Sequence, residues 1–275
     1  MKMTGAELVI RLLERQGIRQ IAGIPGGANL PLYDALARRP VIQHILARHE
    51  QGAGFIAQGM ARTTGQTAVC FATSGPGATN IMTAIADAKL DSIPVVCISG
   101  QVPQHLIGTD AFQEVDVFGM SLSITKHNYL VKSVEELLDT IPEAFRIAAS
   151  GRPGPVWIDI PKDVQNASIE FDEWPEIGSA TPRIEPESPA IEQAQAMIEA
   201  AERPILYLGG GVIHSEACEQ VCTLAERSNL PTVNTLMAMG ALPTDHRLSL
   251  GMLGMHGTYE ANNAMHDCDL LINIG

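Results

Sequence analysis

Apolar and polar positions along the chain alternate in two periods, one typical of strands and the other of helices. Thr4 is followed three residues later by Glu7, as in a capping box, and apolar side chains then recur at helical spacing. Apolar runs that end at glycine or proline are typical of buried parallel strands. The pattern predicts strands at 18–24, 41–47, 67–73, 93–100 and 154–161, and helices at 4–17, 30–38, 78–91 and 134–150. This alternation predicts an α/β fold with a parallel, doubly wound sheet over residues 1–165.

Residues 166–189 break the pattern. They contain six acidic residues and four prolines, without periodicity, and we expect a linker that lies over the surface. A second α/β unit is predicted over residues 190–275. Its predicted elements are a helix at 190–202, a strand at 204–211, a helix at 215–229 and strands at 230–236 and 269–275. Because the sequence stops where a parallel strand meets its ligand-binding loop, we expect this second unit to be incomplete.

Composition removes several classes of function. The formal net charge is −13, and no stripe of basic residues is present, which argues against binding to nucleic acid or to an anionic membrane surface. The amphipathic N-terminus lacks the pattern of a signal peptide, and no run reaches the length of a membrane span. We expect a cytoplasmic protein.

Five cysteines are present, without the spacing of a disulfide framework. Cys70 and Cys97 lie in apolar runs, so we expect buried free thiols. Cys218 and Cys222 lie four residues apart in a helical pattern, without a second pair or a flanking cluster of ligands. We therefore expect no metal site in this chain.

Glycine-rich turns follow three predicted strands, at 25–27, 74–77 and 99–101. Ligands of doubly wound sheets bind at these strand ends, and glycine lets the backbone approach a ligand closely. None of the turns has the spacing of a phosphate-binding loop or of a dinucleotide fingerprint. Taken singly, each is more simply a turn that connects two elements.

Glu50 raises a sharper question, because it heads the run "EQGAGFIA" of mostly small and apolar residues. A carboxylate that loses its water needs a partner or a function. The simpler interpretation is an acidic residue in the first turn of a helix, stabilised by the helix dipole. The segment alone does not decide between the two.

Several segments together resemble one family. They are, in order, "GIPGGANLPLYDAL", "RHEQGAGFIAQGMAR", "TSGPGATN", "DSIPVV", "GTDAFQEVD", "GRPGPVWIDIPKDV", "YLGGGV", "TLMAMG" and "LGMLGMHGTYEAN". They are similar in order and spacing to the first half of acetolactate synthase (acetohydroxyacid synthase) large subunits, which depend on thiamine diphosphate. The resemblance covers the whole chain and is closest to the enterobacterial catalytic subunits. One departure is Ile24, where many members have tyrosine.

The resemblance implies a pyrimidine-binding domain of the thiamine-diphosphate enzymes, followed by a truncated FAD-binding domain of the Rossmann type. It implies that Glu50 hydrogen-bonds N1′ of the cofactor's aminopyrimidine ring, and that Gln113 and Lys162 act beside the substrate. The residues implied to lie near thiamine diphosphate are Pro25, Gly26, Gly27, Glu50, Pro76, Gly77, Asn80 and Phe112. Those implied to contact FAD are Arg152, Gly209, Gly210, Gly211, Thr235, Leu236, Met237, Gly254, Met255 and His256.

The implied reaction condenses two pyruvates, or pyruvate and 2-oxobutanoate, to 2-acetolactate or 2-aceto-2-hydroxybutanoate, precursors of valine, leucine and isoleucine. The family also implies a homodimer, a regulatory small subunit as a further partner, and Mg²⁺ bound through a GDG motif. That motif is absent from the sequence and belongs to a domain beyond residue 275. We therefore expect the chain by itself to be inactive.

Two alternatives remain open on the residues alone. The first is another thiamine-diphosphate enzyme that acts on 2-oxo acids, such as a pyruvate oxidase or a carboligase. The second is a non-catalytic, truncated partner of a full-length subunit. A nicotinamide dehydrogenase is disfavoured, because "GGGVIH" lacks the spacing of the dinucleotide fingerprint.

Overall fold

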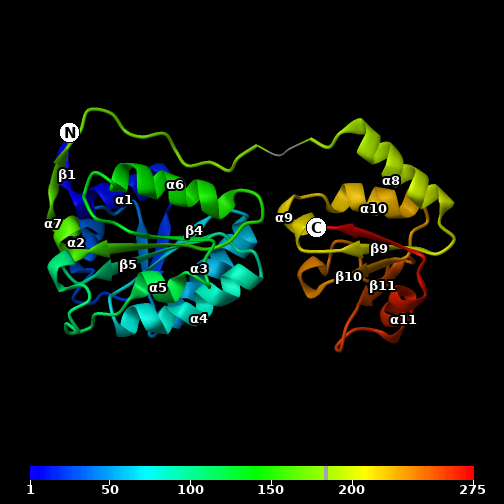
Figure 1. Cartoon of the computed structure of the whole chain (residues 1–275), viewed down its shortest axis with the longest axis horizontal. Helices are drawn as coiled ribbons and strands as arrows, with labels where there is room; N and C mark the ends of the chain where they lie inside the picture. The colour runs from blue at the N-terminus through cyan, green and yellow to red at the C-terminus, as the bar shows by residue number, and fades with distance from the viewer. Residues whose placement is uncertain (183–184) are drawn as a thin grey trace. The chain divides into compact units, whose positions relative to one another are not determined.

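A six-stranded parallel sheet forms the centre of the first unit (Figure 1). The computed structural model describes residues 1–182 and 185–275, and the chain divides at Pro182 into two compact units. The strand order β3-β2-β4-β5-β7-β6 reverses direction between β2 and β4, which confirms the predicted doubly wound parallel sheet. The strands are β2 (Gln20–Gly23), β3 (Gln43–Leu46), β4 (Ala68–Ala72), β5 (Val95–Gln101), β6 (His127–Leu130) and β7 (Val156–Pro161).

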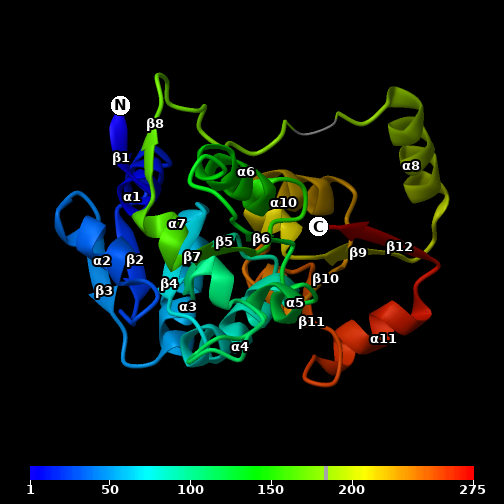
Figure 2. The same ribbon diagram turned by 60° about the vertical axis from the view of Figure 1, so that its left-hand side comes forward.

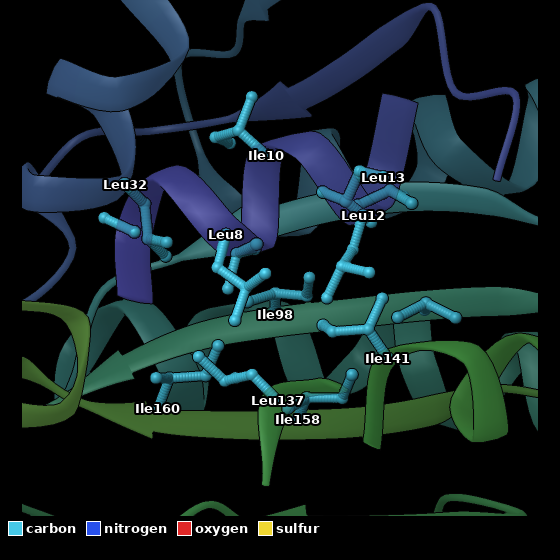
Figure 3. Close-up of a cluster of buried hydrophobic side chains, with 14 of the residues drawn as sticks. Leu8, Ile10, Leu12, Leu13, Leu32, Ile98, Leu137, Ile141, Ile158 and Ile160 are labelled. Atoms are coloured by element: carbon cyan, nitrogen blue, oxygen red, sulfur yellow. The ribbon is translucent and has the colours of Figure 1, made fainter. Parts of the chain in front are cut away.

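Helices cover both faces of this sheet, as Figure 2 shows from a second side. One face carries α1 (Gly5–Arg15), α2 (Leu30–Ala37), α6 (Leu137–Ala149) and α7 (Lys162–Asn166). The other carries α3 (Glu50–Thr64), α4 (Pro76–Leu90) and α5 (Val117–Ser121). In Figure 3, Leu8 and Leu12 of α1 and Ile141 of α6 meet Ile98 and Ile158 of the sheet in one buried cluster. Burial of such side chains supplies most of the stability of the unit.

The face beneath α3 and α4 is built from smaller side chains. Cys70 of β4 pairs in register with Cys97 of β5, and both are buried free thiols, as expected. Burial raises the pKa of Cys97 well above its usual range, so this thiol stays protonated. Gly54 of α3 lies so close to α4 that an added Cβ would be 2.5 Å from the Cβ of Ala84. The two helices can therefore pack tightly side by side.

Part of the segment 166–189, predicted to be a linker, is folded onto the first unit. It contains β8 (Ser168–Glu170), which pairs antiparallel with β1 (Lys2–Thr4), and Trp174 packs against the core of this unit. The prediction was wrong here because a three-residue strand is too short to produce a visible alternation. The predicted capping box is confirmed: Thr4 Oγ1 accepts from the Glu7 N–H, and the Glu7 carboxylate accepts from the Thr4 N–H.

The second unit contains a four-stranded parallel sheet with the order β11-β10-β9-β12, which reverses between β9 and β12. Its strands are β9 (Pro204–Leu208), β10 (Thr232–Asn234), β11 (Ser249–Met252) and β12 (Leu270–Ile274). Its helices are α8 (Ser188–Ala200), α9 (Gly211–His214), α10 (Cys218–Arg227) and α11 (Tyr259–Asp267). Within residues 1–182 and 185–275, no helix combines the length and the apolar character that crossing a membrane requires.

Besides the short strands β1 and β8, the elements that the pattern did not assign include α3, α5, β6, α7, α9, β11 and α11. Strand β6 has a single fully buried residue, and every residue of β11 is half-buried, so neither forms an apolar run. Helix α11 is mostly polar and buries only Ala261 completely. The strand predicted at 204–211 ends at Leu208, because α9 begins within the glycine run that follows.

Candidate functional site

Two glycine-rich turns meet where the strand order of the first sheet reverses. The turn at 24–29 follows β2 and the turn at 73–77 follows β4, which pairs with β2. Thr73 joins them, because its Oγ1 accepts a hydrogen bond of 3.2 Å from the Ala28 N–H. A Cβ added at Gly26 would lie 2.6 Å from the Cβ of Thr73, so this close approach requires glycine. The reversal point of the sheet is thus built from two backbone turns in contact.

Asn29 fixes the shape of the first turn. Its side chain is buried; Oδ1 accepts from the Gly26 N–H at 2.7 Å, and Nδ2 donates to the Ile24 carbonyl at 3.3 Å. Gly100 supports the turn from the neighbouring strand, since an added Cβ would lie 2.5 Å from the carbonyl carbon of Ala28. The glycine at position 100, in the third predicted turn, is therefore explained by packing.

Glu50 lies beside the second turn, as the first residue of α3. Its carboxylate accepts a hydrogen bond of 3.0 Å from Nδ2 of Asn80 on α4. A Cβ at Gly77 would lie 3.5 Å from Oε1 of Glu50. The close crossing of the two helices at Gly54 and Ala84, one turn further along each, places these groups together. Three of the predicted residues, Glu50, Gly77 and Asn80, therefore form one cluster.

The carboxylate of Glu50 is half-buried rather than enclosed. Ala53 and Gly54 of its apolar run pack into the protein, but Phe55 is 41% exposed, and a Cβ at Gly52 would meet no atom within 4 Å among the described residues. Residues three and four positions after Glu50 share its face of the helix, whereas positions two and five do not. Glu50 thus has a packed side and an open side.

Tyr33 of α2 is a neighbour of this cluster that the sequence analysis did not single out. Its ring packs edge-on against His44, at 4.9 Å between centroids, and against Phe71, at 5.9 Å. Burial raises the pKa of Tyr33, with smaller contributions from the nearby Cys70 and Glu50. The hydroxyl of Tyr33 and Nε2 of His44 are buried without a hydrogen-bond partner in the part of the chain that the structure describes. Buried polar atoms of this kind mark a place where water or a ligand can bind.

The segment 109–116 lies against the second turn. A Cβ at Gly75 would be 2.6 Å from the backbone oxygen of Gln113, which itself has a left-handed φ of 57°. Phe112 is 88% exposed, and Gln113 is half-buried. Lys162 follows β7 as the first residue of α7, so it also lies at the carboxyl edge of the sheet. All of the residues predicted for catalysis share this edge.

Arg152 lies elsewhere. It precedes β7, and its guanidinium donates to Ser92 Oγ at 2.7 Å and to the Leu90 carbonyl at 3.1 Å. Both partners precede β5, so Arg152 lies at the amino edge of the sheet, opposite to Glu50. Its predicted contact with FAD stays a prediction.

In the second unit, the turn at 209–211 follows β9 where the strand order reverses. A Cβ at Gly209 would lie 2.8 Å from the carbonyl carbon of Gly275, and one at Gly210 would lie 3.0 Å from Cβ of Met237. The segment 235–237 therefore adjoins this turn, and the turn packs against the end of β12. Oγ1 of Thr235 is buried and has no hydrogen-bond partner among the described residues.

The other predicted FAD residues form a separate loop after β11. Gly254 has a φ of 99°, and its N–H donates to Oδ1 of Asn262 at 2.9 Å. Met255 and His256 are exposed. Among the described residues, no backbone hydrogen bond joins this loop to the turn at 209–211.

One further group contains three side chains of the types that bind metals. The ligand atoms of Cys222, Glu226 and His246 lie within 4.8 Å of one another. His246 Nδ1 accepts a hydrogen bond from the Leu248 N–H, which places the ring proton on Nε2, and Nε2 then donates to Glu226 at 3.2 Å. A histidine that binds a metal through Nε2 needs its proton on Nδ1. This geometry favours a structural hydrogen bond over a metal site.

A parallel sheet with a paired carboxylate and two glycine-rich turns at its reversal point is typical of α/β proteins that bind a ligand at the ends of their strands. Residues 3–120 match the thiamine pyrophosphate enzyme N-terminal TPP binding domain, and residues 191–275 match the central domain of the same enzymes. The chain belongs to the thiamine pyrophosphate enzyme family.

Within this family, the similarity to acetolactate synthase large subunits is confirmed. The chain is 62% identical to the acetolactate synthase isozyme 1 large subunit of Escherichia coli (strain K12), over 100% of the chain and 48% of the relative. It is 54% identical to acetolactate synthase of Mycobacterium bovis, over 100% of the chain and 45% of that protein. It is 51% identical to the Escherichia coli isozyme 2 large subunit, over 99% and 49%. The chain spans about half the length of the curated relatives that it matches.

Proposed function

We propose that the chain forms the N-terminal and central parts of an acetolactate synthase catalytic subunit. The complete enzyme condenses two pyruvates to 2-acetolactate, or pyruvate and 2-oxobutanoate to 2-aceto-2-hydroxybutanoate, with release of one CO₂ in either case, in the synthesis of branched-chain amino acids. One observation carries the proposal: the carboxylate of Glu50, paired with Asn80 beside Gly77, lies at the reversal point of the sheet in a chain of this family.

The residues around Glu50 fit thiamine diphosphate. A carboxylic acid with one oxygen held by Asn80 can share a proton with a ring nitrogen through the other oxygen. Gly27 and Gly52 leave space, since an added Cβ at either position meets no described atom within 4 Å. When bound, thiamine diphosphate supplies an electron sink for the decarboxylation of a 2-oxo acid. Glu50 is then the residue of this chain that holds the activating proton.

The residues of the 109–116 segment and of α7 belong to the substrate side of the proposed site. The exposed ring of Phe112 can exclude water from the reacting centre, and the Gln113 amide can hydrogen-bond the substrate. Lys162 adds a positive charge at the same edge, which attracts the carboxylate of a 2-oxo acid. These three roles concern binding and orientation.

FAD is proposed for the second unit. The buried hydroxyl of Thr235 has free hydrogen-bonding capacity, and it adjoins the glycine turn at the reversal point of the second sheet. The condensation involves no net oxidation, so a flavin supplies no electrons to the overall reaction. We assign no ligand of Mg²⁺ to this chain, and we place those ligands in the part of the enzyme that follows residue 275.

The proposal includes a homodimer through the first unit, with a regulatory small subunit as a further partner. Exposed apolar side chains on α3, on α4 and on α5 with the residue that follows it support an interface there. They are Phe55, Leu90, Phe118, Met120 and Leu122. The cysteine pair Cys70 and Cys97, unlinked although in register, suits the reducing cytoplasm.

A chimaera tests the proposed function. Residues 1–275 would be joined to the remaining half of the Escherichia coli isozyme 1 large subunit, and acetolactate formation from pyruvate would be measured with thiamine diphosphate, Mg²⁺ and FAD. We expect the chimaera to form acetolactate, Glu50→Gln to lower the rate by about 100-fold or more, and the exposed Glu192→Gln to leave the rate unchanged. A folded chimaera without activity, or with full activity after Glu50→Gln, would contradict the proposal.

A further inference from the structure

Asp159 of β7 is a buried carboxylate that the site described above does not use. Its side chain is 1% exposed in the centre of the first sheet. Ser99 Oγ of β5 donates to Oδ1 at 2.5 Å, and Gln101 Nε2 donates to Oδ2 at 2.9 Å. Trp157 Nε1 donates to Ser99 Oγ at 2.7 Å, which turns the serine hydroxyl proton towards Asp159. Each carboxylate oxygen therefore receives one hydrogen bond from the adjacent strand.

Gln101 extends this hydrogen-bond network to the segment 109–116. Its Nε2 also donates to the carbonyl of Val115 at 3.0 Å, and its Oε1 accepts from the Val102 N–H at 2.9 Å. Both amide protons and one acceptor site are thus in use. Rotating the amide by half a turn would point its oxygen at the Asp159 carboxylate and lose the bond to Val115. It would also lose the bond from the Val102 N–H. Asp159 and the Val102 N–H therefore together fix the orientation in which Gln101 holds Val115.

Val115 lies two residues after Gln113, in the segment that rests on Gly75. The backbone of Gln113 contacts Gly75 on one side, and Gln101 holds Val115 from the sheet on the other. Gly75 belongs to the turn whose Gly77 adjoins Glu50. A continuous path of contacts thus leads from the buried carboxylate to the segment that carries Phe112 and Gln113.

We propose that Asp159 is a positioning residue, which through Gln101 holds the segment 109–116 against the turn at 73–77 and so places Gln113 beside Glu50. The importance of that placement for catalysis rests on the proposed function. The holding of segment 109–116 by Asp159 through Gln101 does not. Asp159 itself touches neither the proposed cofactor nor the substrate.

Burying a carboxylate here is unfavourable, which argues that it has a role beyond packing. Burial raises the pKa of Asp159 to about 7, with a smaller upward contribution from Asp116, while the hydrogen bonds from Ser99 and Gln101 lower it. An apolar residue at this position of the strand would avoid that penalty. What it would lose is the acceptor that, with the Val102 N–H, fixes Gln101.

Hydrogen–deuterium exchange on the full 275-residue chain tests the link. Gln101→Met cuts the path between Asp159 and Val115 and keeps the bond from Ser99 to Asp159; Asp159→Leu removes both acceptor oxygens. We expect either variant to speed exchange of amides 111–117 by about tenfold or more. Amides of β4 should change by less than about twofold in Gln101→Met. Asp159→Asn retains an oxygen that can accept from Gln101. In this variant, amides 111–117 should therefore exchange at close to the wild-type rate.

The matched control is Ser99→Ala, which removes one bond to Asp159 without touching Gln101. The proposal is overturned if the 111–117 amides keep the wild-type rate in Gln101→Met, or if they and the β4 amides speed up by the same factor. An equal increase in the exchange rate of the 111–117 amides in Asp159→Asn and Asp159→Leu would also contradict the proposal. If Asp159→Leu does not fold, Gln101→Met decides.

The two proposals fail separately. If the chimaera is inactive but Gln101→Met speeds amide exchange only in segment 111–117, the proposed function is wrong, and the role of Asp159 and Gln101 in holding that segment stands. An active chimaera without that exchange effect would remove the positioning role alone. In an active chimaera, Gln101→Met should lower kcat by about tenfold and leave the affinity for thiamine diphosphate unchanged, because Glu50 and Asn80 are untouched.

Discussion

The two sheets of this chain reverse strand order in the same way but surround their reversal points differently. In the first unit, the glycine-rich turns meet polar side chains from several elements, with Thr73, Asn29 and the pair of Glu50 and Asn80 all within hydrogen-bonding distance of their partners. In the second, the turn at 209–211 packs against Gly275 and Met237. A glycine turn at a strand end, taken alone, therefore predicts only topology. It indicates a site when polar side chains adjoin it, as Glu50 does in the first unit and the unpartnered hydroxyl of Thr235 does among the described residues of the second.

The largest expected effect concerns the glycines of the first unit. Gly100→Ala should lower the free energy of unfolding by about 4 kcal/mol, because its Cβ would overlap the carbonyl of Ala28. Gly27→Ala is the matched control and should change it by less than about 0.5 kcal/mol, since its Cβ meets open space. Urea unfolding followed by tryptophan fluorescence measures this unit selectively, as Trp157 and Trp174 are the two tryptophans of the chain. Equal losses in both variants would show that packing does not explain Gly100.

The next largest effect is the pH dependence of the free energy of unfolding of the first unit, which the buried Asp159 causes. Its pKa of about 7 lies above the value of about 3.9 expected for an unfolded chain, so the folded state holds a proton that the unfolded state has lost. The stability from this proton is present below about pH 4 and is lost as pH rises to about 7, by about 1.4 kcal/mol per pH unit. Relative to Asp159→Asn, the wild type should lose about 2 to 3 kcal/mol between pH 5 and pH 7.

The measurement is urea unfolding of both proteins at several pH values. The exposed Asp172→Asn serves as the control and should retain the wild-type dependence on pH. If the free energy of unfolding changes with pH in the same way in the wild type and in Asp159→Asn, Asp159 titrates as an ordinary carboxylate and the expectation is wrong.

A smaller effect is expected at the threonine that joins the two turns. Thr73→Val should lower the free energy of unfolding by about 2 kcal/mol, because the buried N–H of Ala28 loses its acceptor. Tryptophan fluorescence during urea unfolding again provides the measurement. An unchanged midpoint would show that the turns hold together without this bond.

The smallest effect on stability is expected at the corresponding threonine of the second unit. Thr235→Val should change stability by less than about 0.5 kcal/mol or increase it, because the hydroxyl of Thr235 is buried without a partner among the described residues. Exchange rates of the β9 and β10 amides measure this. In the chimaera, the same variant should weaken the binding of FAD. A large loss of stability would mean that the hydroxyl is satisfied within the chain.

The sequence predicted those parts of the fold whose signals are local. The capping box at Thr4 and the apolar strands β4 and β5 have their full pattern in adjacent residues. Strand β6 lies at the sheet edge with mostly half-exposed residues, and α11 is largely polar, so neither stands out. Their positions are set by tertiary pairing.

The same distinction applies to the site. The cluster of Glu50, Gly77 and Asn80 followed from the family resemblance, and the structure brings the three together. The network of Asp159 was not predicted, because "VWIDIP" has the pattern of an ordinary apolar strand. Its partners lie on β5, which is next to β7 in the sheet although β6 separates the two along the chain. Such a contact becomes visible only once strand order is known.

The most direct test of the central claim, that Glu50 activates the cofactor, is the rate at which bound thiamine diphosphate exchanges the proton at C2 of its thiazolium ring in deuterated water. The chimaera, its Glu50→Gln variant and its Glu192→Gln control would be compared by NMR after acid quenching. We expect exchange to be slowed by about 100-fold or more in Glu50→Gln and to be unchanged in the control. Wild-type exchange in Glu50→Gln, with the cofactor still bound, would contradict it.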